Sequence, residues 1–112
     1  MTFNLTESEM TLLDLLLKHC KTKDDELPID TLADKYFHER VRQGIRSEEK
    51  NAKLNVKQRM RMLVMKMAAK GAPIERKSRL GVGSPATYGF TTYHSIVRAK
   101  KIHEKQILED AA

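Results

Sequence analysis

Cysteine, long apolar runs and secretion signals are scarce or missing in this 112-residue chain. Its single cysteine, Cys20, cannot form a disulfide within the chain and fits a reducing compartment. No apolar run approaches the ~20 residues that a transmembrane helix requires. No basic start followed by an apolar stretch and a small-residue cleavage site is seen, so no secretory signal is expected. We therefore expect a cytoplasmic protein that does not bind membranes.

Residue patterns typical of metal sites or catalytic sites are missing as well. The four histidines are not spaced as metal ligands, and no Ser-His-Asp group or pair of carboxylates stands out. Gly81 and Gly83 resemble part of a phosphate-binding loop, but the Lys-Ser/Thr ending of such a loop does not follow them. The sequence predicts a protein that is not an enzyme and that uses neither a metal nor a cofactor.

Positive charge is abundant and is concentrated in the middle of the chain. The chain has 21 Lys and Arg against 15 Asp and Glu, a formal net charge of +6. Residues 35–101 hold 17 of the basic residues and four acidic ones, whereas residues 1–34 hold three basic and eight acidic residues. Such a segment attracts polyanions, of which nucleic acid is the commonest in a cytoplasm. The alternative is a solvated basic surface without a partner.

Hydrophobic periodicity predicts two helices in the first half of the chain. The segment 6–9, Thr-Glu-Ser-Glu, is a capping box that starts a helix at about residues 7–20. A second helix is expected over about residues 31–42, with Asp30 as its N-cap. Residues 43–54 are polar and charged, and they form either a loop or an extension of a neighbouring helix.

The second half of the chain combines a strongly amphipathic helix with a β-hairpin. The helix is expected over residues 56–70, with Asn55 as its cap and Gly71 closing it. Two short strands are expected at about residues 74–79 and 86–91, around a Gly-rich turn.

A last helix is expected over residues 93–109, and its apolar stripe has two interpretations. The helix either packs back on the domain or forms a homodimer with a second copy of the chain. The stripe consists of Ile96, Ala99, His103 and Gln106 or Ile107.

The order of these elements from Pro28 to Phe90 resembles a winged helix-turn-helix DNA-binding domain of the kind found in small bacterial, phage and plasmid regulators. The matching positions are Ile29, Leu32 and Ala33 in the support helix, residues 56–70 in the recognition-helix position, and Gly71, Ile74, Arg76, Tyr88 and Phe90 around the wing. The resemblance implies a mainly α fold with a β-hairpin. It divides the chain into a winged-helix domain at 1–92 and a C-terminal packing or dimerisation helix at 93–112.

The resemblance also implies a third helix in the DNA major groove and a wing against the DNA backbone or minor groove. Arg and Lys bind guanine, and Asn or Gln binds adenine, through the edges of the bases. The expected base-reading residues are Asn55, Lys57, Gln58 and Arg61, and the expected phosphate-binding residues are Lys50, Lys53, Arg76, Lys77 and Arg79. The expected function is sequence-specific binding of double-stranded DNA by a small transcriptional regulator, which associates with the nucleoid when bound.

Two other functions remain open. The same scaffold could serve as a protein-interaction adaptor, with the acidic first segment and exposed methionines as its contact surface. It could also be a replication or RNA-binding accessory protein. Binding of nucleic acid should weaken steeply with salt, whereas apolar docking to a protein should not.

Overall fold

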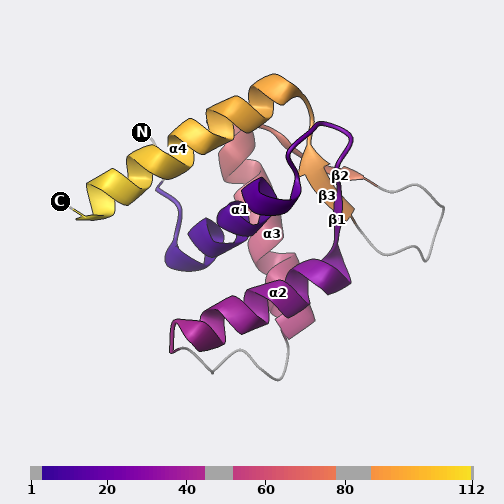
Figure 1. Ribbon diagram of the computed structural model, residues 1–112, viewed down its shortest axis with the longest axis vertical. Helices are drawn as coiled ribbons and strands as arrows, with labels where there is room; N and C mark the ends of the chain where they lie inside the picture. The colour runs from indigo at the N-terminus through magenta and orange to yellow at the C-terminus, as the bar shows by residue number, and fades with distance from the viewer. Residues whose placement is uncertain (1–3, 45–51, 78–86, 112) are drawn as a thin grey trace.

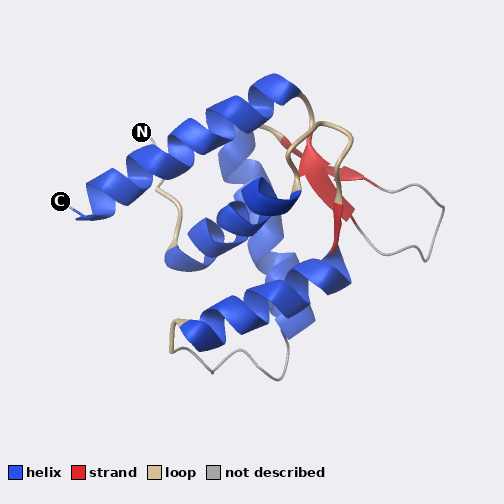
Figure 2. Cartoon of the chain, in the orientation of Figure 1, coloured by secondary structure: helices blue, strands red, loops and turns tan. Residues whose placement is uncertain are grey.

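The computed structural model describes residues 4–44, 52–77 and 87–111, and these ranges contain four helices and a small antiparallel sheet (Figure 1). The elements are α1 (Glu7–His19), β1 (Leu27–Pro28), α2 (Ile29–Arg42), α3 (Ala52–Ala69), β2 (Ile74–Lys77), β3 (Thr87–Phe90) and α4 (Tyr93–Ala111). Helices dominate, and the strands gather at one end of the molecule (Figure 2). The expected mainly α chain with a β-hairpin is confirmed at this level.

Helix α1 forms the centre of the core, because it packs against α2, α3 and α4. The predicted capping box is present: the Thr6 hydroxyl accepts a hydrogen bond from the Glu9 amide at 3.2 Å, and the Glu9 carboxylate accepts one from the Thr6 amide at 2.8 Å. Leu12, Leu13 and Leu16 are completely buried. A well-capped helix with a wide apolar face thus supplies the surface on which the other helices assemble.

Helix α2 starts earlier than the sequence predicts. It begins at Ile29, and Pro28 occupies the N-cap position without a side-chain hydrogen bond, so the expected cap at Asp30 is wrong. Asp30 instead lies in the first turn, where its negative charge is favourable near the positive end of the helix dipole. The helix ends at Arg42 as predicted, and Gly44 follows with a φ of 88°.

Helix α3 also starts early, at Ala52, so Asn55 lies inside the helix and the expected cap at Asn55 is wrong. Residues 52–54 are therefore helical and residues 43–44 form a turn, while residues 45–51 lie outside the described ranges. The end of α3 is as predicted. Gly71 has a φ of 78°, its amide donates to Ala68 at 3.1 Å, and the Ala72 amide donates to Met67 at 2.9 Å. This pair of bonds is the Schellman motif, which favours glycine at that position.

The sheet contains the predicted hairpin and one strand that the sequence did not indicate. Strands β2 and β3 pair antiparallel, with Ile74 opposite Phe90, and the turn between them lies outside the described residues. Strand β1 pairs with the other side of β3, which makes β3 the central strand. Two residues are too few to show strand periodicity, and Pro28, which has no amide hydrogen, is tolerated because β1 is an edge strand.

Helix α4 packs along α1, so the first interpretation of its apolar stripe applies. Ile96 and Ala99 are buried. The Gln106 amide donates to the Leu5 carbonyl at 2.6 Å, and its oxygen accepts from the Leu5 amide at 2.9 Å. One chain thus buries Ile96, Ala99 and Gln106 of this stripe, whereas Ile107 is 49% exposed, and a homodimer through α4 stays a prediction. None of the helices in the described ranges combines the length and apolar character that a bilayer span requires.

Candidate nucleic-acid interface

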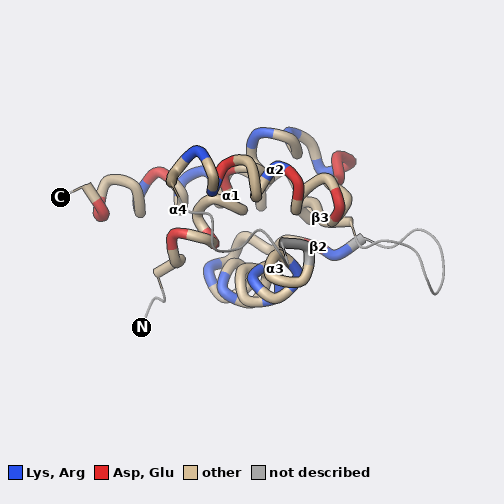
Figure 3. Tube along the Cα trace, turned by 90° about the horizontal axis from the view of Figure 1, so that it is seen from below, with Lys and Arg blue, Asp and Glu red and all other residues tan. Residues whose placement is uncertain are grey.

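Helix α3 turns one long side away from the rest of the molecule. Figure 3 shows α3 on the side opposite to α1, α2 and α4. Its inner positions, Val56, Met60, Leu63 and Met67, are completely buried and recur at intervals of three and four residues. The exposed positions that form what we call the outward face are Leu54, Lys57, Gln58, Arg61, Met62, Met65, Ala68 and Ala69.

Three of the four predicted base-reading residues lie on the outward face. Lys57, Gln58 and Arg61 are exposed and occupy adjacent turns of α3. Asn55 is only partly exposed, and it lines a hollow of about 450 Å³ between α3 and the start of α1. Gln58 and Met62 line the same hollow, so Asn55 and Gln58 lie on one side of α3, as their spacing of three residues predicts.

Lys66 has a structural role, although the sequence groups it with the cations of α3. Its Nζ lies 2.7 Å from Glu9 Oε1, and the two side chains are only 15% and 4% exposed. Burial raises the pKa of the Glu9 carboxyl, but the hydrogen bonds from Lys66 and Thr6 outweigh burial and leave its pKa below the ordinary value. This pair fixes the distance between α1 and α3 and removes one cation from the basic surface.

Arg59 also faces inward, toward α2. Its guanidinium lies 6.0 Å from the centre of the Tyr36 ring, and that of Arg40 lies 5.9 Å from the same ring. Both distances are within the range of cation–π attraction. Tyr36 is completely buried, so Arg59 helps to hold α3 against α2, in keeping with its partial burial.

The predicted phosphate-binding residues are described only in part. Arg76 is exposed on β2, opposite Tyr88, and Lys77 ends that strand opposite Thr87. Lys53 lies in the first turn of α3. Lys50 and Arg79 lie outside the described residues.

Strand β2 contacts α3 and carries basic residues at its outer end (Figure 3). From residue 52 to residue 77 the chain holds eight Lys and Arg and one acidic residue, Glu75. Even with Lys66 neutralised, α3 and β2 together form a strong source of positive potential.

Three large apolar side chains also lie on the outward face, and the sequence did not mark one of them, Leu54, as functional. Leu54, Met62 and Met65 are 55%, 44% and 58% exposed. Met62 and Met65 fall off the core stripe, which is a signal that sequence reasoning can use. Leu54 precedes the predicted helix start, so it could not be assigned to a face.

In the part of the chain that the structure describes, no group of three or more His, Cys, Asp or Glu could hold a metal ion. A scan against models of protein families, a search of curated proteins and a search of solved structures each found no match to this chain. The function must therefore be argued from the geometry and chemistry of the site.

Proposed function

We propose that this protein is a winged helix-turn-helix domain that binds double-stranded DNA sequence-specifically, with α3 in the major groove. The observation that carries the proposal is the outward face of α3, where Lys57, Gln58 and Arg61 are exposed. The helix itself lies on the side of the molecule opposite to the other three helices (Figure 3). The chain order α1, β1, α2, α3, β2, β3 is compatible with that fold. A small domain that occupies a specific DNA site would act as a transcriptional regulator.

The side chains of the outward face match the chemistry of base edges. Arg61 and Lys57 can donate to the two acceptors of guanine, and Gln58 can donate to and accept from adenine. The major groove is about 12 Å wide and admits one helix of about 10–12 Å diameter. Met65 and Leu54 would contact thymine methyl groups, so the recognised site should contain both G·C and A·T pairs.

The wing would hold the protein against the DNA backbone. Arg76 is exposed on β2, a strand that contacts α3, and Lys77 lies at the outer end of the same strand. Contacts from such cations to phosphates set the register of a protein on DNA without reading its sequence. Lys53 at the start of α3 would contact a phosphate at the other end of the helix, and Lys50 and Arg79 remain further candidates.

Selection of bound oligonucleotides from a random duplex pool tests this proposal, and we expect a defined motif. Arg61→Ala should then weaken binding to the selected site by about 1–3 kcal/mol and relax the preference at one base pair. Lys21→Ala is the control: it removes an exposed cation in the loop after α1 and should leave the base preference of the protein unchanged. Equal weakening of selected and random duplexes by Arg61→Ala would show that Arg61 does not read a base.

A second candidate function is favoured by the apolar part of the outward face. Leu54, Met62 and Met65 could dock against a protein partner, which would make the chain an interaction adaptor. Raising the salt concentration separates the two functions, because DNA binding should fall steeply and apolar docking should not. Competition between duplex DNA and duplex RNA of one sequence tests the remaining alternative, an RNA-binding accessory protein.

A further inference from the structure

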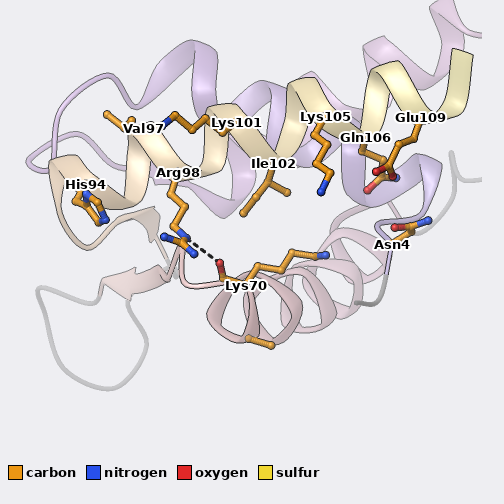
Figure 4. Close-up of a pocket in the computed structure, with 11 residues that line it drawn as sticks. Asn4, Lys70, His94, Val97, Arg98, Lys101, Ile102, Lys105, Gln106 and Glu109 are labelled. Carbon is orange, nitrogen blue, oxygen red and sulfur yellow. Dashed lines mark hydrogen bonds between the residues drawn. The ribbon is translucent and has the colours of Figure 1, made fainter. Parts of the chain in front are cut away.

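A groove of about 550 Å³ lies between α4, the end of α3 and the segment before α1 (Figure 4). One wall is a row of basic residues on α4, because Arg98, Lys101 and Lys105 recur at intervals of three and four. Lys70, just after α3, adds a fourth cation from a different part of the chain. Four cations therefore line one groove, which nothing in the proposed DNA contact requires.

One of these cations is held in place by a hydrogen bond, and the three lysines are not neutralised by a carboxylate of the described residues. Arg98 Nε donates to the Lys70 carbonyl at 3.1 Å, which joins α4 to the end of α3 (Figure 4). In the described ranges, no carboxylate forms an ion pair with Lys70, Lys101 or Lys105. Among the described residues that line the groove, only Glu109 is acidic, and it lies at the end away from Arg98. Positive charges gathered in a hollow focus the electric field there and favour an anion.

The groove also offers an apolar surface beside the cations. Ile102 points into the space between α4 and the end of α3, and Val97 and Ala69 line it as well. Volumes of about 300–1,000 Å³ are typical of small-molecule sites, which combine an apolar lining with a few polar or charged groups. The occupant should therefore carry its negative charge at one end and a less polar body at the other.

We propose that this groove binds an organic phosphate of about mononucleotide size, carrying at least two negative charges. The four cations that line the groove bind the phosphate groups, and the body of the ligand lies over Ile102. A DNA duplex fits less well. Its phosphates could contact the cations of the groove, but they could not reach the apolar surface formed by Ile102, Val97 and Ala69. The inference goes beyond the proposed DNA binding and does not depend on it.

Calorimetric titration of the full chain, without DNA, tests the proposal with ADP, pyrophosphate and adenosine as probes. We expect ADP to bind more tightly than pyrophosphate, because only ADP uses both the cations and the apolar floor. Adenosine, which lacks charge, should bind at least about tenfold more weakly than ADP. ADP affinity should also fall as salt is added.

A matched pair of variants locates the site. Lys101→Glu should weaken ADP binding at least about tenfold, because it reverses a charge inside the groove. Lys100→Glu makes the same change at the neighbouring residue of α4, which is exposed but does not line the groove, and should change ADP affinity by less than about threefold. Both residues are exposed and should tolerate the change, and circular dichroism of the two variants checks that the helix content is unchanged.

Three results would overturn the proposal. The first is no binding of ADP or pyrophosphate at millimolar concentration, and the second is equal weakening by Lys100→Glu and Lys101→Glu. The third is loss of duplex DNA binding in Lys101→Glu with no binding of either small phosphate, which would make the groove part of a DNA contact. The DNA proposal is tested separately. It fails if the duplex selection gives no motif, or if Arg61→Ala weakens selected and random duplexes equally.

Discussion

The Glu9–Lys66 pair is the clearest case in which a cation of α3 serves the interior of the fold and not its surface. It joins the start of α1 to α3, and Glu9 also completes the capping box with Thr6. A buried carboxylate with several hydrogen bonds is costly to leave unpaired. Lys66 is therefore needed by the fold and is a poor candidate for contacting DNA.

The depressed pKa of Glu9 predicts how stability should depend on pH. Because the folded-state pKa is lower than in the unfolded chain, its stabilising effect is present above the unfolded-state pKa and is lost as pH falls through the folded-state pKa. Glu9→Gln should cost about 1–3 kcal/mol at pH 7. The variant should also lose less stability than the natural protein between neutral and acidic pH in urea unfolding.

Asp34→Asn is the matched control for this prediction. The Asp34 side chain is 73% exposed and lies 3.6 Å from His38, so its removal should change stability little at either pH. If Glu9→Gln and the natural protein lost the same stability on acidification, Glu9 would not be the group responsible.

At the scale of an element, α3 divides its residues between holding the fold and presenting a surface. Leu63 is completely buried, whereas Met65, two residues later, is 58% exposed. Leu63→Ala should lower the free energy of unfolding by about 2–5 kcal/mol, because it leaves a cavity in the core. Met65→Ala should change it by no more than about 0.5 kcal/mol.

Chemical denaturation measures both effects, and binding measurements add a second test. Met65→Ala should weaken binding of the selected duplex while leaving the fold intact, because Met65 lies on the outward face. A large loss of stability in Met65→Ala would mean that this side chain is packed against the domain and is not available to a partner.

The ends of α2 and α3 provide a second prediction for elements. Gly44 and Gly71 both have positive φ, where a side chain costs roughly 1–2 kcal/mol. A Cβ at Gly44 would meet nothing within 4 Å, whereas one at Gly71 would lie 2.9 Å from Arg98 Nε. Both alanine variants should be destabilised by about 1 kcal/mol in thermal unfolding, and Gly71→Ala by somewhat more, because the Arg98 side chain must move. If Gly71→Ala lost no more stability than Gly44→Ala, the Arg98 side chain would move aside without an energetic cost.

For the whole molecule, the separation of charge along the chain predicts salt-dependent binding. The acidic segment 1–34 supplies α1, which is central and capped, while the basic residues 52–77 form α3 and β2 on one side. Arg76→Ala should weaken all duplex sequences alike and reduce the slope of log affinity against log salt by about one. Lys21→Ala should leave that slope unchanged in a fluorescence anisotropy titration. A sequence-dependent effect of Arg76→Ala would assign it to base reading.

Much of this architecture follows from local patterns. The capping box at residues 6–9, the Gly71 terminus and the amphipathic stripe of α3 each depend on residues within one or two turns, so the chain sequence alone indicates them. The concentration of positive charge is likewise a property of composition. These features are predictable because hydrogen bonds and apolar spacing within a helix do not require knowledge of the neighbours.

The assignment of individual side chains required the packed structure. Strand β1 exists only because β3 offers a second edge, and Lys66 turns inward only because Glu9 lies beside it. The convergence of Lys70 with Arg98 depends on where α4 crosses the end of α3. Such contacts join residues far apart in the chain, and their energies depend on burial and distance, which local sequence patterns do not encode.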